Sequence, residues 1–250
     1  MTLILGLECS EGLRLASDGQ VTYTTTGQGT RGPIQKIFLQ WNNVAWGGSG
    51  AVGLIQEAMA ALHHEYGQTN RFDNKAKDAK KKIWEAVNKT LRPLLKDRYI
   101  EVPNEPPPHT SFLFVGWPPD GPFIMEIGKN LLQMDHLQAA AGYGAIGSGD
   151  IFPYFALASL AHFEVRKRTL REAKMIAYRV IQDAIKVAAW GLGPPIQMIE
   201  IVKPSKSDES GKGRALDDAE LKQIEEQVVA WKELEKETLS SLIVMTATKE

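Results

Sequence analysis

The first eighteen residues contain two short segments typical of β-strands, and the first of them begins almost at once. Residues 3–7 form an apolar run that indicates a buried strand. Residues 13–17 alternate as a second strand, and Glu11-Gly12 supplies a turn between the two. A hairpin of this length brings the chain back to its starting point, so we expect Asp18 to lie beside Thr2.

Thr2 directly follows the initiator methionine, and a residue as small as threonine is one that methionine aminopeptidases normally expose. If Met1 is removed, residue 2 carries a free α-amine and a β-hydroxyl. An N-terminal amine can take the proton of its own hydroxyl, so one residue supplies both nucleophile and base. The unperturbed pKa of an α-amine is about 7.7–8.0, which leaves a usable basic fraction near neutral pH. Many chains begin Met-Thr, so these two residues alone do not indicate catalysis.

Further short motifs follow in order along the chain, each at the end of a predicted strand or before a predicted helix. They are SDGQ at residues 17–20, Lys36 at the head of KIFL, GGSG at residues 47–50 and AIGSG at residues 145–149. Together with Thr2 they resemble the proteasome β-type subunits, and most closely the bacterial HslV-like peptidases. The resemblance extends to the minor bacterial proteasome homologues and covers roughly residues 2–200.

The order of predicted elements indicates an α+β fold: strands, two helices, strands, two helices and a strand. This is the order of a four-layer αββα sandwich, the N-terminal-nucleophile hydrolase fold, in which each sheet is buried on both faces. We expect residues 1–203 to form this domain, with residues 20–35 as a loop or irregular hairpin. The predicted helices cover residues 51–66, 73–98, 148–163 and 169–190, the last opened by the capping box TLRE.

The remaining residues, 204–250, are predicted to be a linker and a C-terminal helical extension. Residues 204–213 are polar and contain Gly, Ser and Lys, as linkers do. A helix is expected over residues 218–239, with an apolar stripe that packs either on its own domain or on a neighbouring subunit. Residues 243–245 predict a short final strand.

The chemistry of the candidate site follows from four side chains and one backbone group. The Thr2 hydroxyl attacks a peptide carbonyl, and its amine takes the proton. A charged Lys36 stabilises the alkoxide, while Asp18 keeps Lys36 in place and protonated. The backbone N–H of Gly47 faces the oxyanion, where glycine allows close approach. The resemblance implies matching roles and adds Ser148 as a hydrogen-bond partner of the Thr2 amine.

The resemblance also implies where substrate binds and how the protein is assembled. The segment matching residues 20–35, with Gln20 and Thr22, lines the substrate cleft in that family. Ala45 and Ser49 are small and would leave a roomy first pocket. The implied activity is that of a threonine-type endopeptidase acting on unfolded proteins or peptides inside a homo-oligomeric double ring. An unfoldase ATPase or cap is a further expected partner, and the chemistry needs no cofactor or metal.

One region departs from the resembled pattern and leaves two other functions open. Proteasome β subunits usually place an Asp and a Ser after the fourth helix, but residues 187–193 contain no acid or hydroxyl. The nearest acid, Asp183, lies two turns earlier. We therefore expect weak activity on small peptides. The alternatives are a catalytically weak or silent ring subunit and a small-molecule N-terminal-nucleophile amidohydrolase.

Composition excludes several other classes of protein. The net charge of −1 gives no general attraction to nucleic acid or membrane. The single Cys9 rules out an internal disulfide and fits a reducing compartment. His63 and His64 are adjacent on a predicted helix and do not face one another, so a joint metal site is not expected. With no leader and no apolar run long enough to span a bilayer, the expected location is cytoplasmic.

Overall fold

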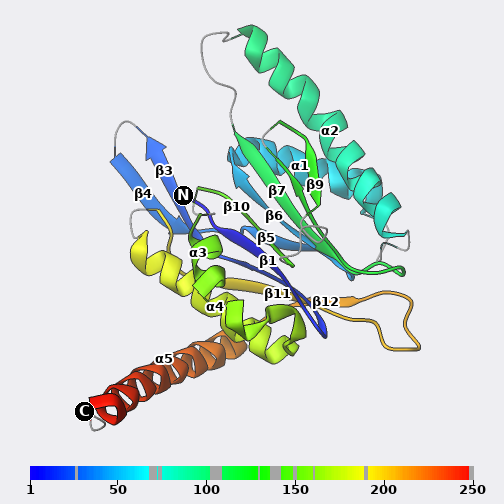
Figure 1. Cartoon of the computed structure of the whole chain (residues 1–250). Helices are drawn as coiled ribbons and strands as arrows, with labels where there is room; N and C mark the ends of the chain where they lie inside the picture. The colour runs from blue at the N-terminus through cyan, green and yellow to red at the C-terminus, as the bar shows by residue number, and fades with distance from the viewer. Residues whose placement is uncertain are drawn as a thin grey trace.

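The computed structural model of the chain describes residues 1–25, 28–67, 72, 75–101, 109–128, 130–135, 142–148, 151–159, 161–188 and 191–247. Figure 1 shows two sheets in the middle of the molecule with helices on their outer sides. The first sheet has the order β10-β1-β2-β11-β12 and the second has the order β5-β6-β7-β8-β9. Neighbouring strands are antiparallel in both.

The strands of the first sheet are β1 (Ile4–Cys9), β2 (Gly12–Ser17), β10 (Tyr143–Ile146), β11 (Gln197–Val202) and β12 (Lys212–Ala215). Those of the second are β5 (Ile37–Trp41), β6 (Val44–Gly50), β7 (Thr110–Gly116), β8 (Phe123–Ile127) and β9 (Gln133–Asp135). A separate hairpin is formed by β3 (Gln20–Thr25) and β4 (Gln28–Pro33). Of the loop or irregular hairpin predicted for residues 20–35, the hairpin is confirmed, and its strands pair without a register shift.

The helices are α1 (Val52–Tyr66), α2 (Ala76–Glu101), α3 (Ile151–Ser159), α4 (Leu170–Val187) and α5 (Asp218–Ala247), with short 3₁₀ turns at Ala161–Phe163 and Val165–Lys167. The predicted capping box opens α4: the Thr169 hydroxyl accepts the N–H of Glu172, and the Glu172 carboxylate accepts the N–H of Thr169. An N-cap of this kind contributes about 0.5–2 kcal/mol to stability.

Three apolar layers hold these elements together. In β1, Ile4 faces the opposite sheet, while Leu5 and Leu7 face the helices, as the two-residue period of a strand requires, and Leu3 just before the strand lies in the same layer as Leu5 and Leu7. Burial of each side chain of this size contributes about 1.5–3 kcal/mol. The layer between the sheets includes Leu13, Leu15, Ile37, Leu113, Val115, Ile124, Ile199 and Ile201. A third layer joins the second sheet to α1 and α2 through Trp46, Leu62, Ile83, Val87, Phe112 and Phe114.

The C-terminal region differs from its prediction. The last two residues of the predicted linker, 212 and 213, belong to β12, which pairs with β11 at the edge of the first sheet. The strand predicted at residues 243–245 is wrong, because α5 continues to Ala247. No Gly or Pro interrupts this run, and the hydroxyls of Ser240 and Ser241 bond to carbonyls four residues earlier, which keeps them inside a helix.

The first half of α5 packs on its own chain. Ile224 and Val228 are buried in the apolar layer that also contains α4, whereas Leu234 and Leu239 are exposed. Figure 1 shows the C-terminal part of α5 extending away from the sheets. The helix therefore continues the fold at one end and presents a free face at the other.

Three further expectations concern the middle of the chain. The helix α2 passes through Pro93 without ending there and continues to Glu101. The N-cap predicted at Asp73 and the stiff connector predicted at residues 105–108 lie outside the described residues. Among the helices that the structure describes, none is long and apolar enough to cross a membrane.

Candidate active site

Asp18 lies at the centre of the candidate site and is fully buried, with 0% of its surface exposed. The pairing of β1 with β2 brings it beside the first residues of the chain. Its Oδ1 accepts the backbone N–H of Leu3 at 2.9 Å, and its Oδ2 accepts those of Gln20 and Gly193 at 3.3 Å each. Three backbone donors therefore hold the carboxylate in one position, as an ionised group away from water requires.

Lys36 forms a buried ion pair with this carboxylate. Its Nζ lies 2.8 Å and 2.9 Å from the two oxygens of Asp18, and only 7% of the residue is exposed. Burial lowers the pKa of Lys36, while the charge and hydrogen bonds of Asp18 oppose that change. The same Nζ lies 3.5 Å from the carbonyl oxygen of Met1, so the ammonium sits directly beside the start of residue 2.

Thr2 and Ser148 meet because β10 pairs with β1. The backbone N–H of Thr2 donates to Ser148 Oγ at 3.2 Å. Between β10 and Ser148, Gly147 has a φ of +109°, and a Cβ there would come within 2.1 Å of the Thr2 carbonyl oxygen. Only glycine fits this close approach. The nitrogen that would become the α-amine after removal of Met1 is thus already next to a hydroxyl.

While Met1 is present, the free α-amine of the chain is that of Met1 and not that of Thr2. Burial and the charge of Lys36 lower the pKa of the Met1 amine. The Met1 side chain lies against Gly191, where an added Cβ would meet its Cγ at 2.4 Å. The segment that follows α4 therefore borders the start of the chain.

A cavity of about 210 Å³ opens next to Thr2. It lies between the segment from β3 to β5, the end of β6 and helix α1. Most of its lining is apolar, and the polar side chains are those of Thr2, Lys36 and two glutamines. Beside Thr2 and Lys36, the lining residues are Val21, Ile34, Gln35, Phe38, Gly48, Gly50, Val52, Ile55, Gln56 and Met59.

Three residues predicted for oxyanion and substrate binding are not among those that line this cavity: Gly47, Ala45 and Ser49. Gly47 faces the layer between the sheets, where an added Cβ would lie 2.8 Å from Ile4 Cδ1, and Gly48 lines the cavity instead. Ala45 is fully buried in the same layer. The hydroxyl of Ser49 points toward Gly147, at 3.1 Å from the position of a Cβ there.

Of the two predicted cleft residues of the hairpin, Gln20 is not among the residues that line the cavity. The side chain of Gln20 covers Gly193, and its Nε2 has no hydrogen-bond partner among the described residues. The side chain of Thr22 lies outside the part of the chain whose side chains are described. The structure thus brings together Thr2, Asp18, Lys36 and Ser148.

Two residues at the site were missed by the sequence reasoning. Gly193 donates its N–H to Asp18, and Gln197 bonds to the backbone of Lys36. Gly193 lies in the predicted helix-breaking segment, which is the only signal it offers. By contrast, Asp183 binds Lys232 and lies 3.7 Å from Arg179, in the contact between α4 and α5 and away from the site.

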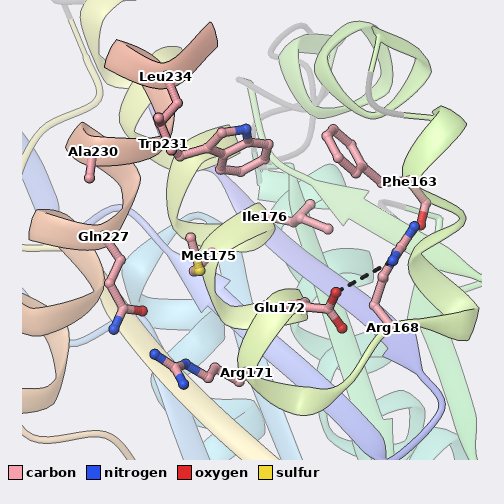
Figure 2. A pocket seen from close by; sticks show the side chains of 10 residues that line it. All are labelled: Phe163, Arg168, Arg171, Glu172, Met175, Ile176, Gln227, Ala230, Trp231 and Leu234. Atoms are coloured by element: carbon pink, nitrogen blue, oxygen red, sulfur yellow. Dashed lines mark hydrogen bonds and ion pairs between the residues drawn. The ribbon is translucent and has the colours of Figure 1, made fainter.

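A second cavity of about 590 Å³ lies where α4, α5 and the 3₁₀ turns meet. Figure 2 shows Trp231, Phe163 and Ile176 around it, with Arg168 held to Glu172 by an ion pair of 3.4 Å. Nothing in this lining resembles a nucleophile with its base, so we do not assign the reaction to it. Within the described residues, no cluster of three His, Cys, Asp or Glu could hold a metal ion.

Comparison with known proteins identifies the fold. No protein-family model and no curated protein sequence matches the chain. A mutant of Anbu from Hyphomicrobium sp. strain MC1 matches with a TM-score of 0.68 and 15% identity, over 96% of this chain and 97% of that one. The Anbu complex from Pseudomonas aeruginosa, described as a helical assembly, matches with a TM-score of 0.69 and 17% identity, over 96% of each chain.

The αββα fold predicted from the sequence is confirmed, because the Anbu structures share the N-terminal-nucleophile hydrolase fold. At these identities the similarity establishes the fold alone. The assignment to the proteasome β-type and HslV-like peptidases is corrected, because the solved structures reported above are Anbu proteins.

Proposed function

We propose that the chain is a threonine-type endopeptidase whose nucleophile is Thr2, exposed by removal of Met1. The observation that carries this proposal is the buried ion pair of Lys36 and Asp18 beside residue 2. A charged lysine and a charged aspartate destabilise the fold when they are buried without a partner. Here the two are paired and lie beside Thr2, a residue that can act as nucleophile.

The proposed reaction has two steps. The Thr2 hydroxyl adds to the peptide carbonyl, and its proton passes to the amine of the same residue. The charged Lys36 stabilises the developing oxyanion and alkoxide, and the amine then gives the proton to the leaving nitrogen as the C–N bond breaks. Water hydrolyses the acyl ester on Thr2 and restores the hydroxyl. Ser148 orients the amine, and the backbone N–H of Gly47 remains the proposed oxyanion donor.

The proposed substrate is an unfolded protein or a peptide. The cavity beside Thr2 is lined mainly by apolar side chains, among them Ile34, Phe38, Ile55 and Met59. We expect it to accept an apolar side chain on the acyl side of the cleaved bond. The substrate contacts predicted from the sequence stay predictions; they are those of Gln20, Thr22, Ala45 and Ser49.

The proposed assembly is a homo-oligomeric double ring. The Anbu complex from Pseudomonas aeruginosa is described as a helical assembly, which supports self-association of this fold and offers an open-ended alternative to a ring. Native mass spectrometry distinguishes them, because a closed ring gives one mass and an open helix gives a series. An unfoldase ATPase or cap and a cytoplasmic location are further parts of the proposal; the single cysteine supports the location.

A catalytically weak or silent subunit is the second candidate. It is favoured by the sequence of residues 187–193, which offers no acid or hydroxyl to the Thr2 amine. The intact mass of the native protein and the activity of one variant distinguish a peptidase from a silent subunit. We expect native protein to lack Met1 and to hydrolyse peptides, and Thr2→Ala to keep the fold but lose the hydrolysis. A chain that keeps Met1 in all its native forms, or an active Thr2→Ala protein, would contradict the proposed mechanism.

A further inference from the structure

Gln197, the first residue of β11, joins the two sheets through its side chain. Its Oε1 accepts the backbone N–H of Lys36 at 3.0 Å, and its Nε2 donates to the carbonyl oxygen of Ile34 at 2.5 Å. The strand β5 of the other sheet begins at Ile37. Both hydrogen bonds therefore hold the short segment that leads into this strand and carries the active-site lysine.

The same end of β11 also lies next to the acid of the ion pair. Gln197 pairs with Ser17, the residue before Asp18, in the ladder between β11 and β2. Gly193, four residues earlier, donates its N–H to Asp18 Oδ2. Consequently residues 193–197, which lead into β11, contact the carboxylate through the backbone of Gly193 and the lysine segment through the side chain of Gln197.

The contacts of Gln197 are specific for the segment at residues 34–36. A glutamine that only stabilised its own strand would bond within its sheet or to water. Here both polar atoms of the amide bond to the opposite sheet's leading segment, and Ile34 is held further by its N–H, which donates to Gly19 at 2.8 Å. The Lys36 carbonyl accepts the N–H of Gly48 at 3.4 Å, and Gln197 is the side chain that holds the Lys36 N–H from the opposite sheet.

We propose that Gln197 is a positioning residue that determines where Lys36 Nζ lies relative to Asp18 and Thr2. The catalytic consequence rests on the proposed function, whereas the effect on Lys36 does not. Without the amide, the Lys36 N–H and the Ile34 carbonyl lose their partners, and the segment relaxes toward water. A shift of about 1 Å in a positioned catalytic group can cost on the order of a hundredfold in rate.

Two variants and one matched control test this. Gln197→Met keeps the length of the side chain and removes both hydrogen bonds. Gln197→Asn keeps the amide but is one methylene shorter and cannot reach both partners. Gln182→Met is the control, because Gln182 makes a 2.8 Å hydrogen bond to Lys232 in the contact between α4 and α5, far from the site.

The first measurement does not depend on activity. Acetic anhydride modifies uncharged, accessible amines, and peptide mapping by mass spectrometry gives the rate at Lys36. We expect this rate to rise about tenfold in both Gln197 variants, equivalent to the loss of one hydrogen bond of ordinary strength, and to stay unchanged in Gln182→Met. Equal protection of Lys36 in the folded variants and the wild type would refute the proposal.

The second measurement is peptide hydrolysis. We expect kcat to fall by about a hundredfold in Gln197→Met while KM changes far less, because most of the cavity lining, including Phe38, Ile55 and Met59, lies outside the segment at residues 34–36. If the wild type shows no Thr2-dependent turnover, the proposed function fails, and the modification rate of Lys36 still decides the role of Gln197. If circular dichroism shows that Gln197→Met does not fold, Gln197→Asn supplies the same comparison.

Discussion

Replacement of Asp18 by asparagine tests the ion pair on which the site is built. The amide keeps the size of the carboxylate and an oxygen for the N–H of Leu3, but it removes the charge facing Lys36. Loss of one partner of a buried ion pair typically costs about 3–5 kcal/mol, because the other charge is left without compensation. We expect the free energy of unfolding, measured by urea denaturation at pH 7, to fall by about this amount.

The pH dependence of this loss has a predictable sign. Burial lowers the pKa of Lys36 and Asp18 raises it, so Asp18→Asn lowers the pKa further below its ordinary value of 10.5. Between the lowered pKa and 10.5, the unfolded chain binds more protons than the folded chain, and stability increases with pH. The destabilisation of the variant relative to the wild type must therefore shrink as the pH rises from the Lys36 pKa of the variant to that of the wild type, and stay constant above it.

Asp183→Asn is the matched control. Asp183 is partly exposed and pairs with Lys232 and Arg179 at the surface, where such pairs contribute about 0–1 kcal/mol. We expect Asp18→Asn to abolish labelling of Thr2 by a threonine-directed inhibitor and Asp183→Asn to leave it unchanged. The reverse result, or an Asp18→Asn protein as stable as the control, would show that the acidic partner has been placed wrongly.

Three further outcomes are expected. Ser148→Ala should lower kcat by up to about tenfold with little change in stability, because a neutral hydrogen bond to the Thr2 nitrogen contributes about 0.5–1.5 kcal/mol; an unchanged kcat would remove Ser148 from the site. Met59→Lys should move the preferred acyl-side residue from apolar to acidic in a peptide library, and an unchanged preference would show that the cavity is not the first pocket. Glu200→Gln should cost about 3–5 kcal/mol in urea denaturation, because Arg14 is 1% exposed and pairs with it, yet Thr2 labelling should persist.

The sequence predicts the parts of this site that depend on neighbouring residues. The hairpin predicted from the turn signal and from the alternation of residues 13–17 is present, with its turn at Ser10-Glu11, one residue earlier than predicted, and it places Asp18 beside the start of β1. The capping box at Thr169 is equally local and is present as predicted. The residue preferences of turns and the periods of strands and helices are enough to predict a contact when both partners lie within one hairpin or one helical turn.

The side-chain directions in β6 could not be predicted in the same way. Gly47, Gly48 and Gly50 carry no side chains whose polarity would indicate a face. The large ring of Trp46 packs with α1 and α2, and the two-residue period then turns Ala45 toward the other sheet. The cavity is consequently lined by Gly48 and Gly50 together with α1, rather than by Ala45.

Contacts between residues that lie far apart along the chain could not be predicted from the sequence either. Gln197 and Lys36 are 161 residues apart, and no spacing rule connects them.

We still propose residues 1–203 as the catalytic unit and residues 204–250 as its extension. The pairing of β12 with β11 and the burial of Ile224 show that this extension begins as part of the packed fold.

The segment after α4 supplies backbone groups to the site in place of side chains. Gly193 donates to Asp18, and Gly191 borders Met1, but the hydrogen bond shown for the nitrogen of residue 2 within the described chain goes to Ser148. A free amine in this position can take the proton of its own residue's hydroxyl, yet the ammonium that results has one hydrogen bond within the described chain to orient it toward a leaving nitrogen.

Breakdown of the tetrahedral intermediate should therefore limit peptides more than esters, because an alcohol leaves without needing full protonation whereas an amine does not. We expect an ester to be cleaved much faster than the peptide with the same acyl group, by a larger ratio than in water. The two are compared at equal acyl residue by kcat/KM. Equal rates would mean that the amine is an efficient acid as well as a base, and that a partner other than Ser148 holds it.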